Sequence, residues 1–161
     1  MKLSNPAKLV ISLLVPLAIG GVGSFFTMPA ISTWYNDLAK PALNPPNWVF
    51  APVWTILFIL MGVAAYLVWR QGLEKKGIKS ALLIFIFQLL LNCFWSYLFF
   101  GIHNPAVAFT EILSLLFAIM ALFLAFFQVS RKAAYLIIPY ILWVGFATYL
   151  NYAVWQLSIL N

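Results

Sequence analysis

Few side chains in this sequence could perform acid–base, nucleophilic or metal chemistry. The 161 residues include three acids and one histidine. His103 falls in a short turn, and the acids Asp37, Glu74 and Glu111 are far apart along the chain. No metal-ligand spacing, nucleophile–base pair or glycine-rich phosphate loop is present. The sequence therefore argues against a hydrolase or a metalloenzyme and predicts no required cofactor.

The residues best suited to chemistry are aromatic rings and amides at helical spacing. One predicted helical face carries, at separations of four, three and four residues, Gln88, Asn92, Trp95 and Phe99. A second carries, at separations of four, three and one, Trp143, Ala147, Leu150 and Asn151. Such faces are typical of a site that recognises a flat apolar molecule by ring contact and orients it with a few amides.

The elements that must position these residues are membrane-spanning helices. The chain is 65% hydrophobic and 7% charged, with a mean hydropathy of +1.03, which excludes a water-soluble surface of normal charge density. Apolar segments of about 20 residues recur, and no alternating β-barrel pattern is present. We predict an all-α integral membrane protein, a single domain over 1–161, with five transmembrane helices at about 7–27, 51–69, 80–100, 106–128 and 134–157. Cys93 lies inside one of them, as a small core residue without a disulfide partner.

The basic residues predict the orientation of the bundle. If the chain crosses the membrane five times, eight of its nine basic residues lie on one side: Lys2, Lys8, Arg70, Lys75, Lys76, Lys79, Arg131 and Lys132. The ninth, Lys40, lies on the other side. By the positive-inside rule the N-terminus is cytoplasmic and the C-terminus outside in a bacterial plasma membrane, with the mitochondrial outer membrane as the eukaryotic equivalent. The net charge of +6 is then explained by membrane topology and by contact of the basic residues with the surface of the lipid bilayer. No basic domain remains that could bind nucleic acid.

A stiff loop is predicted over 28–50, on the outer side. Pro41, Pro45 and Pro46 fix backbone angles and make their predecessors extended, and Pro52 is expected in the first turn of the next helix. Such a segment is suited to cover a site.

The predicted topology places the aromatic faces at one depth. Counting at about 1.5 Å per residue from the outer helix ends puts Trp54, Trp95 and Asn92 about 5, 8 and 12 Å deep, Asn151 about 9 Å deep and Trp143 near the midplane. Interfacial belts explain the other tryptophans, Trp34, Trp48, Trp69 and Trp155. We therefore predict a pocket under the loop, lined by Trp54, Phe58, Met61, Trp95, Phe99, Trp143, Ala147 and Leu150, with Gln88, Asn92 and Asn151 as polar anchors.

Three alternatives stay open at this point. The aromatic rings could instead fill a solid core, with Asn92 and Asn151 bonded to each other across helices. Gly20 and Ser24 in the first span could serve helix packing or form a wall beside a ligand. Glu111 could have a function, because an acid inside the membrane is costly to bury. Alternatively, since it lies near the membrane interface, its carboxylate could simply reach water or pair with a side chain of a neighbouring helix.

Four groups of motifs are distributed along the chain. They are Trp34-Tyr35 through Lys40-Pro41; Pro45-Pro46-x-Trp48-x-Phe50 with Pro52-Val53-Trp54-Thr55; Gln88-Leu89-x-Leu91-Asn92-x-x-Trp95 with Phe99-Phe100-Gly101; and Pro139-Tyr140-x-x-Trp143-x-x-Phe146-Ala147-Thr148-x-Leu150-Asn151. In these motifs the sequence resembles the TspO/MBR family, and the resemblance covers nearly its whole length. It implies a five-helix bundle, commonly a homodimer. The resemblance also implies that the protein binds porphyrins, such as protoporphyrin IX and haem, as ligands. Some members of the family also bind sterols and benzodiazepine-type molecules. In the family these ligands occupy a cavity, and the residues that match its lining are Trp54, Asn92, Trp95, Trp143, Ala147 and Leu150.

Two departures from the family pattern bear on ligand choice. The sterol motif proposed for the last helix ends in a basic residue, but Gln156 stands here, which argues against sterol binding. Phe58 replaces a tyrosine of many relatives and removes a hydroxyl from the pocket.

The leading hypothesis is a membrane receptor or carrier for a tetrapyrrole. An alternative implied by the resemblance is light-dependent porphyrin degradation, with Trp54 and Trp143 as redox partners of the excited ligand. A third is transport of porphyrin or sterol-like ligands across the bilayer, although no inverted repeat is visible.

Overall fold

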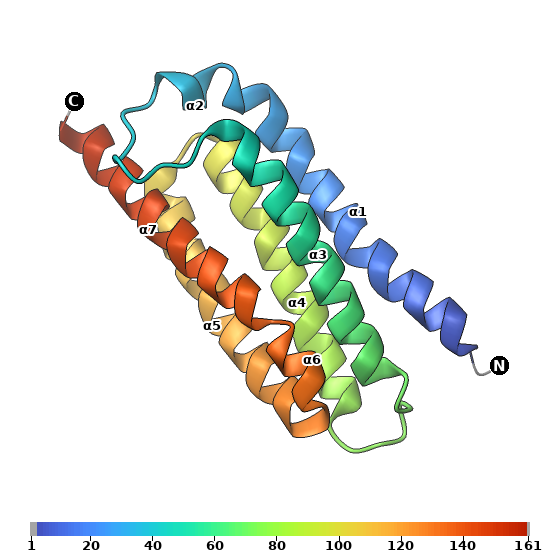
Figure 1. Cartoon of the computed structure of the whole chain (residues 1–161). Helices are drawn as coiled ribbons and strands as arrows, with labels where there is room; N and C mark the ends of the chain where they lie inside the picture. The colour runs from blue at the N-terminus through green and yellow to red at the C-terminus, as the bar shows by residue number, and fades with distance from the viewer. Residues whose placement is uncertain (1–2, 161) are drawn as a thin grey trace.

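The chain folds as a bundle of membrane-length helices, as a computed structural model shows for residues 3–160 (Figure 1). Within these residues five helices are long and apolar enough to cross a membrane. The elements are α1 (Asn5–Ile31), α2 (Trp34–Asp37), α3 (Asn47–Trp69), α4 (Ile78–Ser96) with a π-helical turn η1 (Tyr97–Gly101), α5 (Pro105–Val129), α6 (Arg131–Tyr135) and α7 (Ile138–Leu160). The predicted all-α bundle of five spans is confirmed.

The long helices pack side by side around a common core. α1 packs against α3 and α4, α5 lies between α4 and α7, and α6 contacts α3. α2 and residues 38–46, which we name the roof, cross one end of the bundle between α1 and α3 (Figure 1). The start of α1 and the end of α7 lie at opposite ends of the bundle (Figure 1).

Three of the differences between the observed and the predicted helix boundaries involve prolines. α1 continues to Ile31 with Pro16 and Pro29 inside it. Each proline lacks the N–H that would bond the carbonyl four residues earlier, and such a proline is tolerated in a spanning helix because neighbouring groups satisfy the freed carbonyl. α3 begins at Asn47, so the expectation that Pro52 lies in the first turn is wrong: it lies in the second. The last span is interrupted before Pro139, giving α6 and α7, because proline lacks the N–H that would continue the ladder.

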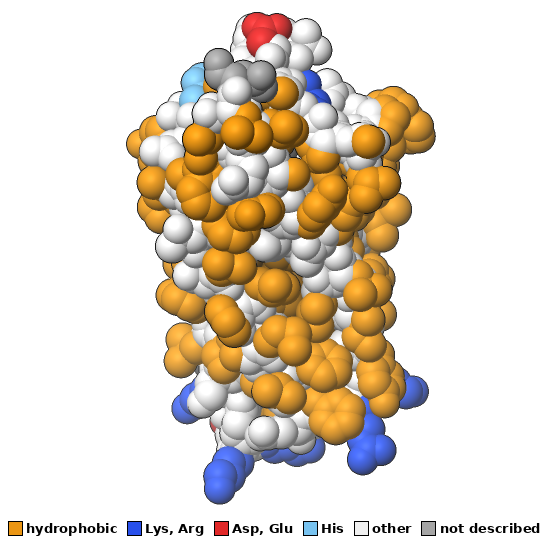
Figure 2. Space-filling model, turned by 90° about the vertical axis from the view of Figure 1, so that its left-hand side faces the viewer, with side chains coloured by type: hydrophobic (Ala, Val, Ile, Leu, Met, Phe, Trp, Pro, Cys, Tyr) orange, Lys and Arg blue, Asp and Glu red, His pale blue; other side chains and the backbone are white. Residues whose placement is uncertain are grey.

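Charge separates along the bundle axis as the sequence predicts. Figure 2 shows lysine and arginine gathered at one end, an apolar belt between, and acid and histidine at the opposite end. We name these the basic end and the roof end. Lys2, one of the predicted basic residues, lies outside the described part of the chain.

The core is solid toward the basic end. Large side chains that are essentially inaccessible there include Met61, Val68, Ile78, Ile119, Leu122 and Phe126. Toward the roof end, a cavity lies between α1, α3, α4 and α7.

Candidate ligand-binding cavity

A cavity of about 380 Å³ lies under the roof between α1, α3, α4 and α7. Its wall includes nine of the eleven residues that we predicted for the pocket: Trp54, Phe58, Asn92, Trp95, Phe99, Trp143, Ala147, Leu150 and Asn151. The volume falls within the range of about 300–1,000 Å³ typical of small-molecule sites. The structure thus brings all nine residues together, and the expectation of a wholly solid core is wrong at this end.

α4 and η1 supply one wall. Asn92 and Trp95 lie one turn apart, and the π turn that follows carries Phe99 and Phe100 on the same side. The Trp95 indole stacks on Phe99, with ring centroids 5.3 Å apart, and its Nε1–H donates to Asn151 Oδ1 at 3.0 Å. This bond holds Trp95 flat against the cavity.

Asn151 is a brace between helices. It accepts the Trp95 bond through its oxygen and donates through Nδ2 to the Pro105 carbonyl at 2.7 Å. The start of α5 is thereby tied to α7. The alternative that the two asparagines bond each other is wrong, because Asn92 has a different partner.

Asn92 belongs to a buried amide–phenol network. Its Nδ2 donates to the Tyr140 hydroxyl at 3.0 Å, and that hydroxyl donates to Gln88 Oε1 at 2.9 Å. Gln88 and Met61 are fully buried beneath the cavity and do not line it, so their predicted place in the pocket is wrong. The Asn92 carbonyl oxygen accepts no hydrogen bond from a described residue and is the amide acceptor available to a ligand.

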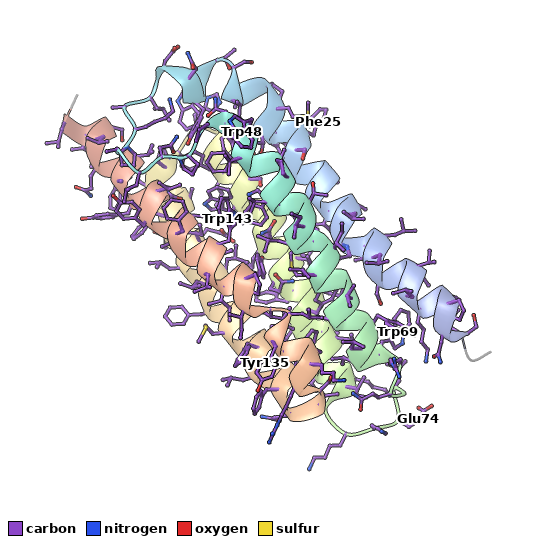
Figure 3. The ribbon with its side chains drawn as sticks, viewed as in Figure 1. Phe25, Trp48, Trp69, Glu74, Tyr135 and Trp143 are labelled. Atoms are coloured by element: carbon purple, nitrogen blue, oxygen red, sulfur yellow. The ribbon has the colours of Figure 1, made fainter. Side chains whose placement is uncertain are left out.

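α3 and α7 face each other across the cavity with aromatic rings. Trp54 stacks on Phe58 at 5.6 Å between centroids. Trp143 projects from α7 toward α3 (Figure 3) and meets Phe50 edge-on at 6.0 Å. Sequence reasoning missed Phe50, because the helix was predicted to begin after it; its position four residues before Trp54 was the available signal.

The glycines of α1 serve both packing and the cavity wall. A Cβ on Gly20 would lie 2.4 Å from Phe58 Cε2, and one on Gly23 would lie 3.2 Å from Ser96 Oγ. Both glycines also line the cavity. The two roles that the sequence left open therefore coincide, since a small residue brings α1 close while leaving free volume beside it.

The cavity opens sideways toward lipid. Its exposed lining residues all belong to two helices: Leu17, Gly21, Ser24 and Met28 on α1, and Asn47, Ala51 and Thr55 on α3. Each set recurs every three or four residues and forms one edge of the opening. A Cβ on Gly21 would meet nothing within 4 Å. Sequence reasoning did not find this opening.

The roof is anchored by rings. Trp34 stacks on His103 at 4.4 Å and meets Phe99 edge-on at 5.5 Å, so it is more than a belt residue. Tyr35 is 5% exposed, lines the cavity, and donates its hydroxyl to Asn44 Oδ1 at 2.8 Å. Burial raises the pKa of the Tyr35 phenol, an effect that the Asn44 hydrogen bond only partly opposes.

The structure offers little for acid–base or metal chemistry. Among residues 3–160 no three His, Cys, Asp or Glu side chains gather into a metal-binding group. Glu111 is 8% exposed, and neither carboxyl oxygen has a hydrogen-bond partner there. The expectation that it reaches water or pairs with a neighbouring helix is therefore wrong.

Comparison with known proteins agrees with this architecture. The model of the TspO/MBR family matches residues 12–156. The chain is 44% identical to the tryptophan-rich protein TspO of Chlorobaculum tepidum over 88% of this chain and 90% of that protein. It is 42% identical to the tryptophan-rich protein TspO of Archaeoglobus fulgidus over 96% of this chain and 99% of that protein. It is 40% identical to the human translocator protein over 84% of this chain and 80% of that protein.

Proposed function

Because the chain belongs to the TspO/MBR family, we propose that it is a membrane receptor or carrier for a flat hydrophobic molecule of the tetrapyrrole class, such as protoporphyrin IX or haem. One observation carries the proposal: indole rings from α3, α4 and α7 line a single cavity under the roof. Stacked and edge-on ring contacts favour a planar aromatic guest.

The lateral opening supports the choice of an oily ligand. A molecule dissolved in the bilayer would enter between α1 and α3 without crossing water, past the small residues Gly21, Ser24 and Ala51. A guest larger than the enclosed volume would keep one edge in this opening. The solid core toward the basic end supports binding over passage through the bundle.

Lys40 is suited to the carboxylates of a porphyrin. Its Nζ lies 4.8 Å from the ring centroid of Tyr35, a residue of the cavity wall, and donates to the Asn36 and Leu38 carbonyls at 3.0 and 3.3 Å. We expect Lys40→Gln to weaken protoporphyrin IX binding by less than about tenfold, the scale of an exposed ion pair, and to leave binding of its dimethyl ester unchanged. Equal losses for acid and ester would remove Lys40 from the site.

The test of the proposal is to fill the cavity. Ala147 is 9% exposed and lines it, so Ala147→Phe should abolish saturable binding of protoporphyrin IX to the purified protein. The matched control is Ala121→Phe on the lipid-facing side of α5, which should bind as the parent does. Unaltered binding by Ala147→Phe, with both variants folded, would place the ligand elsewhere.

Light-dependent porphyrin degradation is a second candidate, supported by the presence of Trp54 and Trp143 in the same wall. Absorbance decay of bound protoporphyrin IX under illumination should slow in the double variant Trp54→Phe, Trp143→Phe at equal occupancy. The same decay rate in parent and variant would mean simple photobleaching.

Membrane placement and assembly are part of the proposal. The basic end is assigned to the cytoplasm of a bacterium, and the protein is expected to form homodimers. A cysteine introduced at Glu74 should be labelled from the cytoplasmic side only, and one at Asp37 from the outside only. The reverse pattern would invert the assignment.

A further inference from the structure

A second concavity of about 310 Å³ lies at the basic end, between α1, α3 and α4. Its walls are apolar apart from one serine, and include Ile11, Trp69, Leu82 and Ile86. None of its lining residues belongs to the roof-end cavity. We name it the basic-end groove.

The groove lies on the basic-end side of a close backbone approach between α1 and α3. A Cβ on Gly62 would lie 2.7 Å from the Ser12 carbonyl oxygen and 2.9 Å from Leu13 Cα, so the backbones meet there. Closer to the basic end, α3 carries the large Trp69, which projects toward the first turns of α1 (Figure 3). A bulky side chain below a glycine contact keeps the helices apart and leaves the groove.

The one serine in the groove wall has no hydrogen-bond partner among the residues that the structure describes. Ser12 is 5% exposed, and its hydroxyl makes no hydrogen bond within residues 3–160. A buried hydroxyl is normally bonded. This one is free to donate to an acceptor that enters the groove, such as an ester carbonyl.

Positive charge stands where the groove meets the membrane surface. Lys8 lies one turn before Ser12 on α1, and Lys79 lies one turn before Leu82 on α4, so each shares a helix face with groove residues. Neither lysine forms an ion pair with a described residue. Arg70 follows Trp69, Lys75 and Lys76 follow in the loop, and the single acid at this end is Glu74.

We propose that the basic-end groove is a binding site for an anionic phospholipid. One acyl chain would lie in the groove, an ester carbonyl would accept from Ser12, and the phosphate would lie between Lys8 and Lys79. Lipid tails are as apolar as the groove, so its walls add shape but little affinity. Selectivity for an anionic lipid comes from Lys8 and Lys79, because a headgroup with net negative charge neutralises their positive charges. A zwitterionic lipid or a sterol has no net negative charge and would not do so.

Trp69 gives a local readout, because the other tryptophans lie on or toward the roof end. The purified full-length protein is placed in phosphatidylcholine vesicles that contain increasing fractions of either dibrominated phosphatidylglycerol or dibrominated phosphatidylcholine. Bromine quenches indole fluorescence by contact, and subtraction of the Trp69→Phe signal isolates Trp69. We expect the brominated anionic lipid to quench Trp69 at a lower mole fraction than brominated phosphatidylcholine does. The required mole fraction should fall by about fivefold for each of the two lysines, the equivalent of about 1 kcal/mol per lysine.

Two double variants distinguish a specific lipid site beside the groove from non-specific attraction of anionic lipid to all the positive charge at the basic end. Lys8→Gln with Lys79→Gln should remove the preference, whereas Arg131→Gln with Lys132→Gln, at the same end but on α6, should keep it. Ile86→Phe should fill the groove and lower quenching by both brominated lipids. Equal quenching by the two lipids in the parent, equal loss in both double variants, or displacement of the anionic lipid by cholesterol would overturn the proposal.

Discussion

Removal of the Trp143 indole is the sharpest perturbation of the roof-end cavity. The ring is partly buried, meets Phe50 at 6.0 Å and Phe146 at 5.9 Å between centroids, and lines the cavity. A buried tryptophan covers about 150–250 Å². If about 60–100 Å² of that area faces the ligand, its loss in Trp143→Ala costs about 1.5–2.5 kcal/mol at about 25 cal/mol per Å².

This loss corresponds to about a 10- to 70-fold rise in the dissociation constant of protoporphyrin IX. The assay is a titration of the purified protein, followed by the absorbance of the bound porphyrin so that removal of a fluorophore does not disturb the signal. Trp143→Phe should recover most of the affinity, because it restores an aromatic surface.

Trp155→Ala is the matched control for this experiment. Trp155 lies on the same helix but packs against Phe109 and Tyr152, at 5.6 and 6.1 Å between centroids, and does not line the cavity. Its removal should leave affinity unchanged. If both alanine variants lose affinity equally, or neither does, the reasoning from ring contact in this cavity is refuted.

Three predictions concern the bundle itself, each measured by thermal unfolding of the purified protein in detergent. Glu111→Leu should raise stability by about 1–3 kcal/mol, because it removes a buried carboxyl group that has no partner in the described structure; an unchanged or lower midpoint would mean that the carboxyl is bonded. Tyr140→Phe should cost about 2–4 kcal/mol, since two buried amides lose their shared hydroxyl, and a loss below about 1 kcal/mol would contradict this network. Gly62→Ala should destabilise by about 1–3 kcal/mol through contact with the backbone of α1, whereas Gly21→Ala, which meets open space, should be nearly neutral; equal effects would argue against the close approach.

The number of spans and their charge asymmetry could be read from the sequence because they are local properties. A segment in hydrocarbon must satisfy its own backbone, so about 20 apolar residues already specify a spanning helix. Helical periodicity then placed Asn92 with Trp95, and Trp143 with Ala147, on shared faces. Depth counting brought those faces to one level without knowledge of any contact.

Several details were beyond such reasoning because they depend on partners distant in the chain. The Asn92 side chain donates to the Tyr140 hydroxyl and the Asn151 side chain to the Pro105 carbonyl, and both partners lie more than 40 residues away in the chain. Pro52 could stand in a first or a second turn, and the start of α3 at Asn47 selects the second. Glu111 could have reached water if neighbouring helices had left room.

The bilayer therefore dictates the helices one at a time, from composition and length alone. The hollow under the roof, its opening between α1 and α3 and the groove beside Trp69 arise from the relative placement of those helices. That placement depends on where a glycine such as Gly62 admits a neighbouring backbone and where a large ring holds it away, which no single segment encodes.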